Sequence, residues 1–345
     1  MAKLFFLLSG EHPTLPFSEL KAILEAEGCT FRQLDKLDQV LRIEAKAKAI
    51  NSVKKRAAMT KICSLELFHC NAEFSEIMKA ANEIPFGKLA LKGESFVVRV
   101  KRVKRYSERL DTMLLERKLG EIILKEASEA RVNLETPQKT FFGVITDGKF
   151  VFGLKLAETV PSEFVRRSPS RKPFFHPSAM TAKLARCMVN LTKPKAGDLV
   201  LDPFCGTGSI LIEAGLIGCR VMGLDVKRRM IHGSLRNFKF YKITTEGLVV
   251  ADARALPIQT VECVVTDPPY GRSATTLGST TREIVERTLD ELAEVLGEGR
   301  RVCLATPKTM KVSEIGEKYG FRHIESHFVY IHRSLTREIA VFERK

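Results

Sequence analysis

A short glycine loop that follows a run of apolar residues constrains the fold of this chain more than any other feature. Residues 199–214 read Leu-Val-Leu-Asp-Pro-Phe-Cys-Gly-Thr-Gly-Ser-Ile-Leu-Ile-Glu-Ala. The pattern predicts a buried strand ending at Asp202, a tight turn through Gly206 and Gly208, and then a helix. Glycines leave the backbone bare, so we expect a ligand to lie against this loop, with Thr207 between the two glycines as a further contact.

The region around this loop alternates between predicted strands and predicted helices. Strands are expected at residues 199–201, 220–224, 248–250, 261–266 and 302–305, and helices at residues 180–191, 209–217, 227–241 and 282–296. Such alternation predicts an α/β fold with a doubly wound, mostly parallel sheet, of the Rossmann-like type. The last two apolar segments, 323–331 and 338–342, predict an antiparallel pair at the end of that sheet.

Acidic residues close three successive predicted strands: Asp202, Asp225 and Asp252. In an open α/β sheet, ligands bind outside the carboxyl ends of the strands. The third glycine of the dinucleotide fingerprint is replaced by Leu211, which disfavours a bound pyrophosphate. Single acids after strands are often helix caps, and that alternative applies here too.

These acids suit a cationic nucleoside that carries no phosphate. Asp225 can accept hydrogen bonds from both ribose hydroxyls, and Asp252 from an adenine amine while the Ala253 N–H donates to the ring. Asp202 can favour an ammonium group. The expected ligand is therefore S-adenosylmethionine, and the expected site holds no metal.

The next predicted strand ends in Asp267-Pro268-Pro269-Tyr270. Two prolines make a rigid corner and leave their carbonyls free to accept hydrogen bonds. An aromatic exocyclic amine is a poor nucleophile, and Asp267 and the Pro268 carbonyl can activate it by accepting its N–H groups. Tyr270 can stack on the base. The alternative is a proline-rich strand terminator. Residues 272–281 are either a flap over the base or an ordinary loop.

The charge of the chain points to a polyanionic partner. Its net charge is +15 and is spread over both halves, which favours nucleic acid over a basic protein without such a partner. The densest basic run is expected to contact phosphates, or else to protect a strand edge: Arg99, Lys101, Arg102, Lys104 and Arg105.

Cysteine spacing and hydropathy set the remaining expectations. None of the eight cysteines forms a CxxC pair, which disfavours a zinc site. The sequence has no apolar run of the roughly 18 residues that a membrane span needs. We therefore expect a cytoplasmic protein, and a monomer.

The N-terminal half is predicted to be α+β. Strands are expected at 4–8, 40–43 and 95–103, helices at 18–27, 47–60, 74–82 and 112–127, and a hairpin turn at Asp147-Gly148 between strands 140–145 and 150–156. Residues 158–177 contain four prolines and several cations, and predict an extended connector.

On the Asp-Pro-Pro-Tyr motif and the acid series, the C-terminal half resembles a class I methyltransferase that methylates amines. The N-terminal half resembles a ferredoxin-like module (1–65) followed by a THUMP domain (66–157), then a linker (158–172) before the methyltransferase domain (173–345). End to end, the chain is similar to the archaeal tRNA guanine-10 N2-methyltransferase family.

The resemblance implies mono- and dimethylation of guanine 10 in tRNA. It implies cofactor contacts by residues of the glycine loop and the strand ends, with Phe175 and His176, and amine activation at Asp267, Pro268 and Tyr270. Three alternatives stay open: a tRNA guanine-6 N2-methyltransferase, a DNA adenine N6-methyltransferase and a non-catalytic RNA-binding protein.

Overall fold

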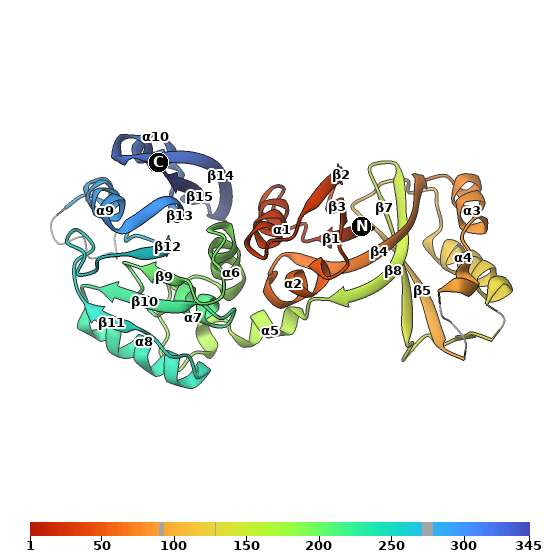
Figure 1. The fold of residues 1–345 in the computed structure, drawn as a ribbon, viewed down its shortest axis with the longest axis horizontal. Coiled ribbons are helices and arrows are strands. Elements are labelled where there is room, and N and C mark those ends of the chain that lie inside the picture. Colours follow the sequence, from red (N-terminus) through yellow and green to blue (C-terminus); the bar gives the residue numbers. More distant parts are fainter. Residues whose placement is uncertain (90–92, 128, 271–278) are drawn as a thin grey trace. The chain divides into compact units, whose positions relative to one another are not determined.

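Figure 1 shows a computed structural model that describes residues 1–89, 93–127, 129–270 and 279–345. The chain forms two compact units. The first unit comprises Met1–Pro13, Cys29–Lys54 and Thr60–Thr159, and the second comprises Thr14–Gly28, Lys55–Met59 and Val160–Lys345. Two pieces of the N-terminal sequence therefore belong to the second unit. In the described part of the chain, no helix is both long enough and apolar enough to cross a membrane.

The first unit is built on one eight-stranded mixed sheet in the order β2-β3-β1-β4-β8-β7-β5-β6. Its strands are β1 (Ala2–Leu8), β2 (Phe31–Leu37), β3 (Val40–Ala45), β4 (Thr60–Asn71), β5 (Ser95–Arg102), β6 (Arg131–Val132), β7 (Lys139–Thr146) and β8 (Lys149–Glu158). Its helices include α3 (Phe74–Asn82) and α4 (Thr112–Glu126), while α2 (Ala49–Arg56) ends within a segment of the second unit.

The predicted hairpin between β7 and β8 is confirmed. Asp147 and Gly148 have φ values of 47° and 67°, as a two-residue turn with two left-handed positions requires. On the β5 side, Phe96 and Val98 pack with Phe141, Phe150 and other aromatic rings in one buried cluster.

Two predictions for the N-terminal half are wrong in detail. Helix α1 (Leu15–Ala26) begins three residues before Ser18, with Pro16 in its first turn. The basic helix stops at Arg56 instead of continuing to residue 60, because the backbone N–H groups of Ala58 and Met59 donate to the Glu19 carboxylate at 2.9 and 2.7 Å. Strands β2 and β4 were not predicted at all, and β4 occupies the middle of the sheet.

The second unit confirms the predicted fold class. Its seven strands lie in the order β11-β10-β9-β12-β13-β15-β14, with parallel pairing from β11 to β13 and antiparallel pairing of β15 with β13 and β14. The strands are β9 (Leu199–Asp202), β10 (Arg220–Asp225), β11 (Gly247–Val250), β12 (Val261–Thr266), β13 (Leu296–Pro307), β14 (Phe321–His332) and β15 (Leu335–Arg344). Besides α1, the helices of this unit are α5 (Pro161–Arg166), α6 (Ala182–Leu191), α7 (Ser209–Gly215), α8 (Arg228–Tyr241), α9 (Thr281–Val295) and α10 (Val312–Gly316).

The prediction of an extended connector over residues 158–177 is wrong. Helix α5 and a 3₁₀ turn (Pro169–Arg171) lie within it. Both begin with proline, at the first position of a helix, where the missing N–H group costs nothing. In this segment, two of the prolines mark the first residue of a helix, so a high proline content did not mean that helices are absent.

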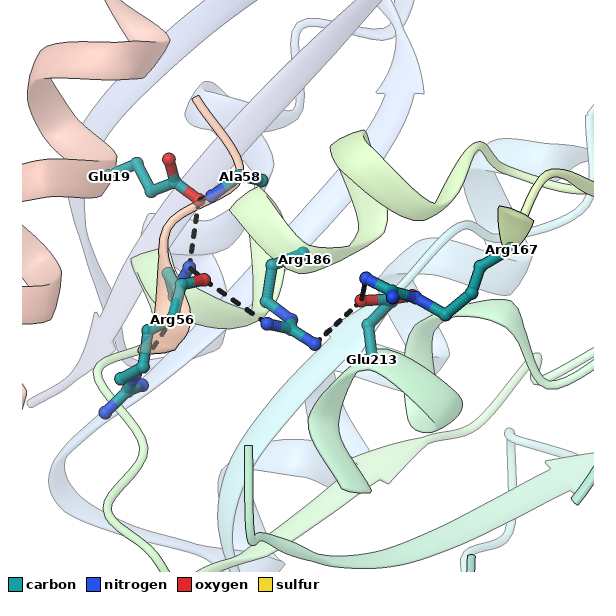
Figure 2. Close-up of polar contacts among 7 residues, drawn as sticks. Glu19, Arg56, Ala58, Arg167, Arg186 and Glu213 are labelled. Carbon is teal, nitrogen blue, oxygen red and sulfur yellow. Dashed lines mark hydrogen bonds and ion pairs between the residues drawn. The ribbon is translucent and has the colours of Figure 1, made fainter. Parts of the chain in front are cut away.

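A buried polar network joins several helices of the second unit (Figure 2). Glu213 on α7 is 1% exposed and lies 2.8 Å from Arg186 of α6 and 2.7 Å from Arg167. Glu19 on α1 is fully buried and accepts a hydrogen bond from Asn190 of α6 at 2.9 Å. Burying these charges is tolerable only because each has several partners.

The network predicts a large penalty for removing its central carboxylate. Glu213→Gln leaves Arg167 and Arg186 without their counter-charge, and should lower the free energy of unfolding by about 3–5 kcal/mol. Urea unfolding followed by circular dichroism measures this. Glu246→Gln is the matched control, because Glu246 pairs with Arg220 on the surface and its loss should change stability little. Equal midpoints for the two variants would contradict the account.

Candidate active site

A cavity of about 190 Å³ opens at the carboxyl ends of the parallel strands in the second unit. The ends of β9 and β10 contribute Asp202 and Asp225 to its wall, and Asp267 follows the end of β12. Three residues from separate parts of the sequence thus face one space, as the sheet topology predicts. The other residues that line it are His176, Ser178, Ala179, Met180, Phe204, Cys205, Gly206, Thr207, Ser209, Ile210, Val226, Lys227, Met230, Pro268, Pro269, Tyr270 and Arg337.

The glycine loop has the conformation that its sequence predicts. Gly206 and Gly208 have φ values of 51° and 76°, in the left-handed region that favours glycine. A Cβ atom on Gly208 would lie 2.7 Å from the Phe238 ring, so a side chain there would clash. A Cβ atom on Gly206 would meet only the Phe204 carbonyl oxygen, at 3.9 Å, so this stretch of backbone stays open.

Buried carboxylates hold the loop in place. Asp202 is 1% exposed and accepts hydrogen bonds from Thr266 Oγ1 at 2.6 Å and the Phe204 N–H at 3.1 Å. Burial raises the pKa of Asp202 to about 7. Asp225 accepts hydrogen bonds from the N–H groups of Gly206 and Lys227, and burial raises its pKa as well.

The two oxygens of Asp267 have different environments. Oδ2 lies 3.3 Å from Arg337 Nη2. Oδ1 is buried and has no hydrogen-bond partner among the described residues. Burial raises the pKa of Asp267 to about 6, against the opposing effects of Arg337 and of the Tyr270 hydroxyl. The group is therefore a carboxylate at neutral pH, with one buried oxygen available to accept a hydrogen bond.

Arg337 also fixes the aromatic ring beside this carboxylate. Its Nε donates to the Tyr270 hydroxyl, and its guanidinium carbon lies 5.6 Å from the centre of the Tyr270 ring. Arg337 was not predicted from the sequence. It comes from β15, whose antiparallel pairing with β13 brings it to the strand ends, and no motif around it signals this position.

The cavity wall contains eight of the residues that the sequence predicted for the site: His176, Asp202, Gly206, Thr207, Asp225, Asp267, Pro268 and Tyr270. Phe175, Gly208, Asp252 and Ala253 do not line it. Asp252 instead pairs with Arg254 at 2.6 Å, which lowers its pKa, and Phe175 is 47% exposed. Gly208 lies in the loop next to the Phe238 ring, and its positive φ allows the turn into the helix. The predicted flap at 272–281 falls mostly on residues 271–278, which lie outside the described residues.

The cations of the basic run in the first unit differ in exposure and in the groups that they contact. Arg102 is half-buried and donates to the carbonyls of Tyr106, Ser107 and Leu110. Lys104 lies 2.7 Å from Asp38. Of the other predicted RNA contacts, Arg99 pairs with Glu116 at 3.6 Å, Lys101 is exposed, and Arg105 is exposed beside a hollow that Arg109 and Phe74 also line.

Solved structures share this architecture. TrmN from Thermus thermophilus aligns with 99% of this chain and 100% of its own, with a TM-score of 0.58 and 20% identity. SMU.472, solved in complex with SAH, aligns with 100% of this chain and 98% of its own, with a TM-score of 0.55 and 14% identity. At these identities the likeness concerns the fold alone. The family described as "RMKL-like, methyltransferase domain" matches residues 169–337, and that described as "DNA methylase" matches residues 89–235.

Sequence relatives decide the family. The tRNA (guanine(10)-N2)-dimethyltransferase of Methanothermobacter thermautotrophicus is 39% identical over 344 residues, which cover 99% of both chains. This chain belongs to that family. The Methanocaldococcus jannaschii member of the tRNA (guanine(10)-N2)-dimethyltransferase family is 31% identical over 98% of this chain and 99% of its own. The Pyrococcus abyssi member is 37% identical over 67% of this chain and 69% of its own. The family resemblance seen in the sequence is thus confirmed.

Proposed function

We infer that this chain transfers methyl groups from S-adenosylmethionine to N2 of guanine 10 in tRNA, and does so twice. Full-length similarity to tRNA (guanine(10)-N2)-dimethyltransferases supports the reaction and its substrate. The single structural observation that carries the inference is the buried, unpartnered Oδ1 of Asp267 beside a cavity suited to the cofactor. The relatives favour guanine 10 over the guanine-6 and DNA adenine alternatives, and the site residues gathered around the cavity disfavour a non-catalytic protein.

The residues of the cavity fit S-adenosylmethionine. When bound, the cofactor supplies a methyl group on a sulfonium centre, which is open to direct attack. Asp202, Asp225 and Asp267 suit a ligand with two positive charges and no phosphate. Gly206 leaves the wall bare where a nucleoside needs close approach. We propose Asp225 for the ribose hydroxyls and Asp202 for the ammonium end; Asp252 would need to leave Arg254 to bind the adenine amine.

We propose that Asp267 and Pro268 activate the guanine amine. Asp267 Oδ1 and the Pro268 carbonyl accept the two N–H groups, which draws the nitrogen toward tetrahedral geometry and frees its lone pair. Arg337 holds Oδ2, so Oδ1 keeps its orientation while the base binds. Tyr270, fixed by the same arginine, stacks on the base, a contact worth roughly 1–3 kcal/mol.

Dimethylation sets a further requirement on this pair of acceptors. After the first transfer the amine retains a single N–H group, so only one acceptor can be used in the second transfer. Asp267 carries the charge and therefore forms the stronger hydrogen bond. We propose that it accepts the remaining N–H and later takes the proton released.

Replacing Asp267 tests the mechanism. Asp267→Asn keeps the shape but removes the charge and one acceptor, so methyl transfer should fall by roughly 10²–10⁴-fold. The assay uses unmodified tRNA, labelled S-adenosylmethionine and mapping of the label, which should appear at guanine 10. Binding of S-adenosylhomocysteine is the control and should change little. Undiminished transfer by the folded variant would contradict the proposed activation, and label at another nucleotide would contradict the proposed target.

We propose that the first unit binds tRNA phosphates through its exposed cations. Lys101 and Arg105 are the strongest candidates. Lys101 is exposed, and Arg105 has a 92% exposed side chain and only a long contact of 3.6 Å with Glu108, whereas Lys104 lies 2.7 Å from Asp38 and Arg102 donates to backbone carbonyls. Guanine 10 lies in a stem, so phosphate contacts would hold the tRNA while the base leaves its stack.

A salt titration tests these contacts. The double variant Lys101→Gln, Arg105→Gln should weaken tRNA binding and reduce the slope of log affinity against log salt by about 1.8. The control, Lys311→Gln with Lys318→Gln, removes the same charge from exposed positions elsewhere. Equal slopes in both double variants would show that only net charge matters, and would overturn the assignment.

A further inference from the structure

A buried lysine lies directly behind the wall of the cavity. Lys172 is 7% exposed, and its Nζ donates a hydrogen bond to Ser209 Oγ at 2.6 Å. Ser209 Oγ in turn lies 3.0 Å from Thr207 Oγ1. Both hydroxyl residues line the cavity, whereas Lys172 does not. Three polar side chains thus form a continuous chain from the protein interior to the cavity.

The ammonium group sets the direction of the first hydrogen bond in this chain. An ammonium has donors and no acceptor, so Ser209 accepts from Lys172. Ser209 keeps its own proton, and either hydroxyl can donate in the contact between Ser209 and Thr207. An anion in the cavity would select the arrangement in which Ser209 donates to Thr207 and Thr207 donates to the anion, backed by the positive charge of Lys172.

The interior around Lys172 has an excess of positive charge. Glu213 is the nearest carboxylate that raises the lysine pKa, but it is already shared by Arg167 and Arg186. Lys172, Arg167 and Arg186 thus share Glu213, although Arg186 is also influenced by the buried Glu19. Burial lowers the pKa of Lys172 to about 8, so the ammonium still prevails at neutral pH. Such an arrangement is stabilised by a further anion nearby.

We propose that Thr207 and Ser209, polarised by Lys172, form the subsite for the carboxylate of the cofactor's methionine end. This inference rests on the proposed function. The carboxylate is the one anionic group of S-adenosylmethionine. Asp202, Asp225 and Asp267 would repel it, and of the cations that line the cavity, Arg337 is already paired with Asp267. Lys172 acts as a positioning residue, because it touches Ser209 and not the ligand.

Another cation lines the cavity and provides a comparison. Lys227 lies two residues after Asp225, and its N–H donates to that carboxylate, which we assign to the ribose. A carboxylate bound at the Thr207 end would therefore not depend on Lys227. Replacing Lys172 should therefore reduce the preference for a ligand that carries the carboxylate, whereas replacing Lys227 should not.

Calorimetry with two ligands tests the subsite without measuring activity. The ligands are S-adenosylhomocysteine and its decarboxylated form, S-adenosyl-3-thiopropylamine, which differ only in the carboxylate. Lys172→Met should weaken binding of the first by roughly tenfold or more and leave binding of the second within about twofold. Thr207→Val should act in the same direction, and Thr207→Ser should restore the preference. Lys227→Met should not lower the ratio of the two affinities.

Each outcome decides between explanations. Equal weakening of both ligands by Lys172→Met would assign the lysine to holding the loop, and would overturn the subsite. Loss of the preference in Lys227→Met alone would move the carboxylate to the other end of the cavity. If Lys172→Met fails to fold by circular dichroism, an unchanged preference in Thr207→Val overturns the proposal. Absence of S-adenosylhomocysteine binding to the unsubstituted protein would instead contradict the proposed function.

Discussion

Hydrogen bonds between strand ends hold the site together. The buried Asp202 at the end of β9 accepts from Thr266 at the end of β12, and Asp225 at the end of β10 accepts from the Gly206 N–H. These bonds join residues that lie 64 and 19 positions apart in the sequence. A buried carboxylate is costly without such partners, so the same contacts that satisfy these acids also fix the glycine loop and the cavity.

Asp267 illustrates how one side chain can be both fixed and available. Arg337 pairs with one of its oxygens and also donates to the Tyr270 hydroxyl, so one side chain contacts both Asp267 and Tyr270. The other oxygen is buried without a partner in the described part of the chain, which is unfavourable for folding alone. Such an unsatisfied acceptor is a cost that substrate binding can remove, and this favours a role in recognising an N–H group. Preorganisation of this kind leaves less reordering for the reaction step.

Features that depend on adjacent residues could be predicted from the sequence. The glycine loop, strand β12 and the antiparallel end of the second sheet were all predicted from local pattern and confirmed in the structure. The confirmed family membership and fold class agree with them.

Features that depend on distant partners could not be predicted. Arg337 reaches the site only through the pairing of β15 with β13. Helix α1 joins the second unit through Glu19, whose partners lie at residues 58, 59 and 190. Strand β4 was not predicted, and its place in the middle of the sheet, between β1 and β8, shows only in three dimensions.

The proposed mechanism depends on Asp267 and the Pro268 carbonyl both accepting hydrogen bonds from the guanine amine. A crystal structure of the protein with S-adenosylhomocysteine and a substrate tRNA tests it most directly. The account predicts Asp267 Oδ1 and the Pro268 carbonyl oxygen each within about 3 Å of N2 of an unstacked guanine 10, with Oδ2 still paired to Arg337. A bound guanine whose amine points away from Asp267, or an Asp267 that keeps no contact with the base, would contradict it.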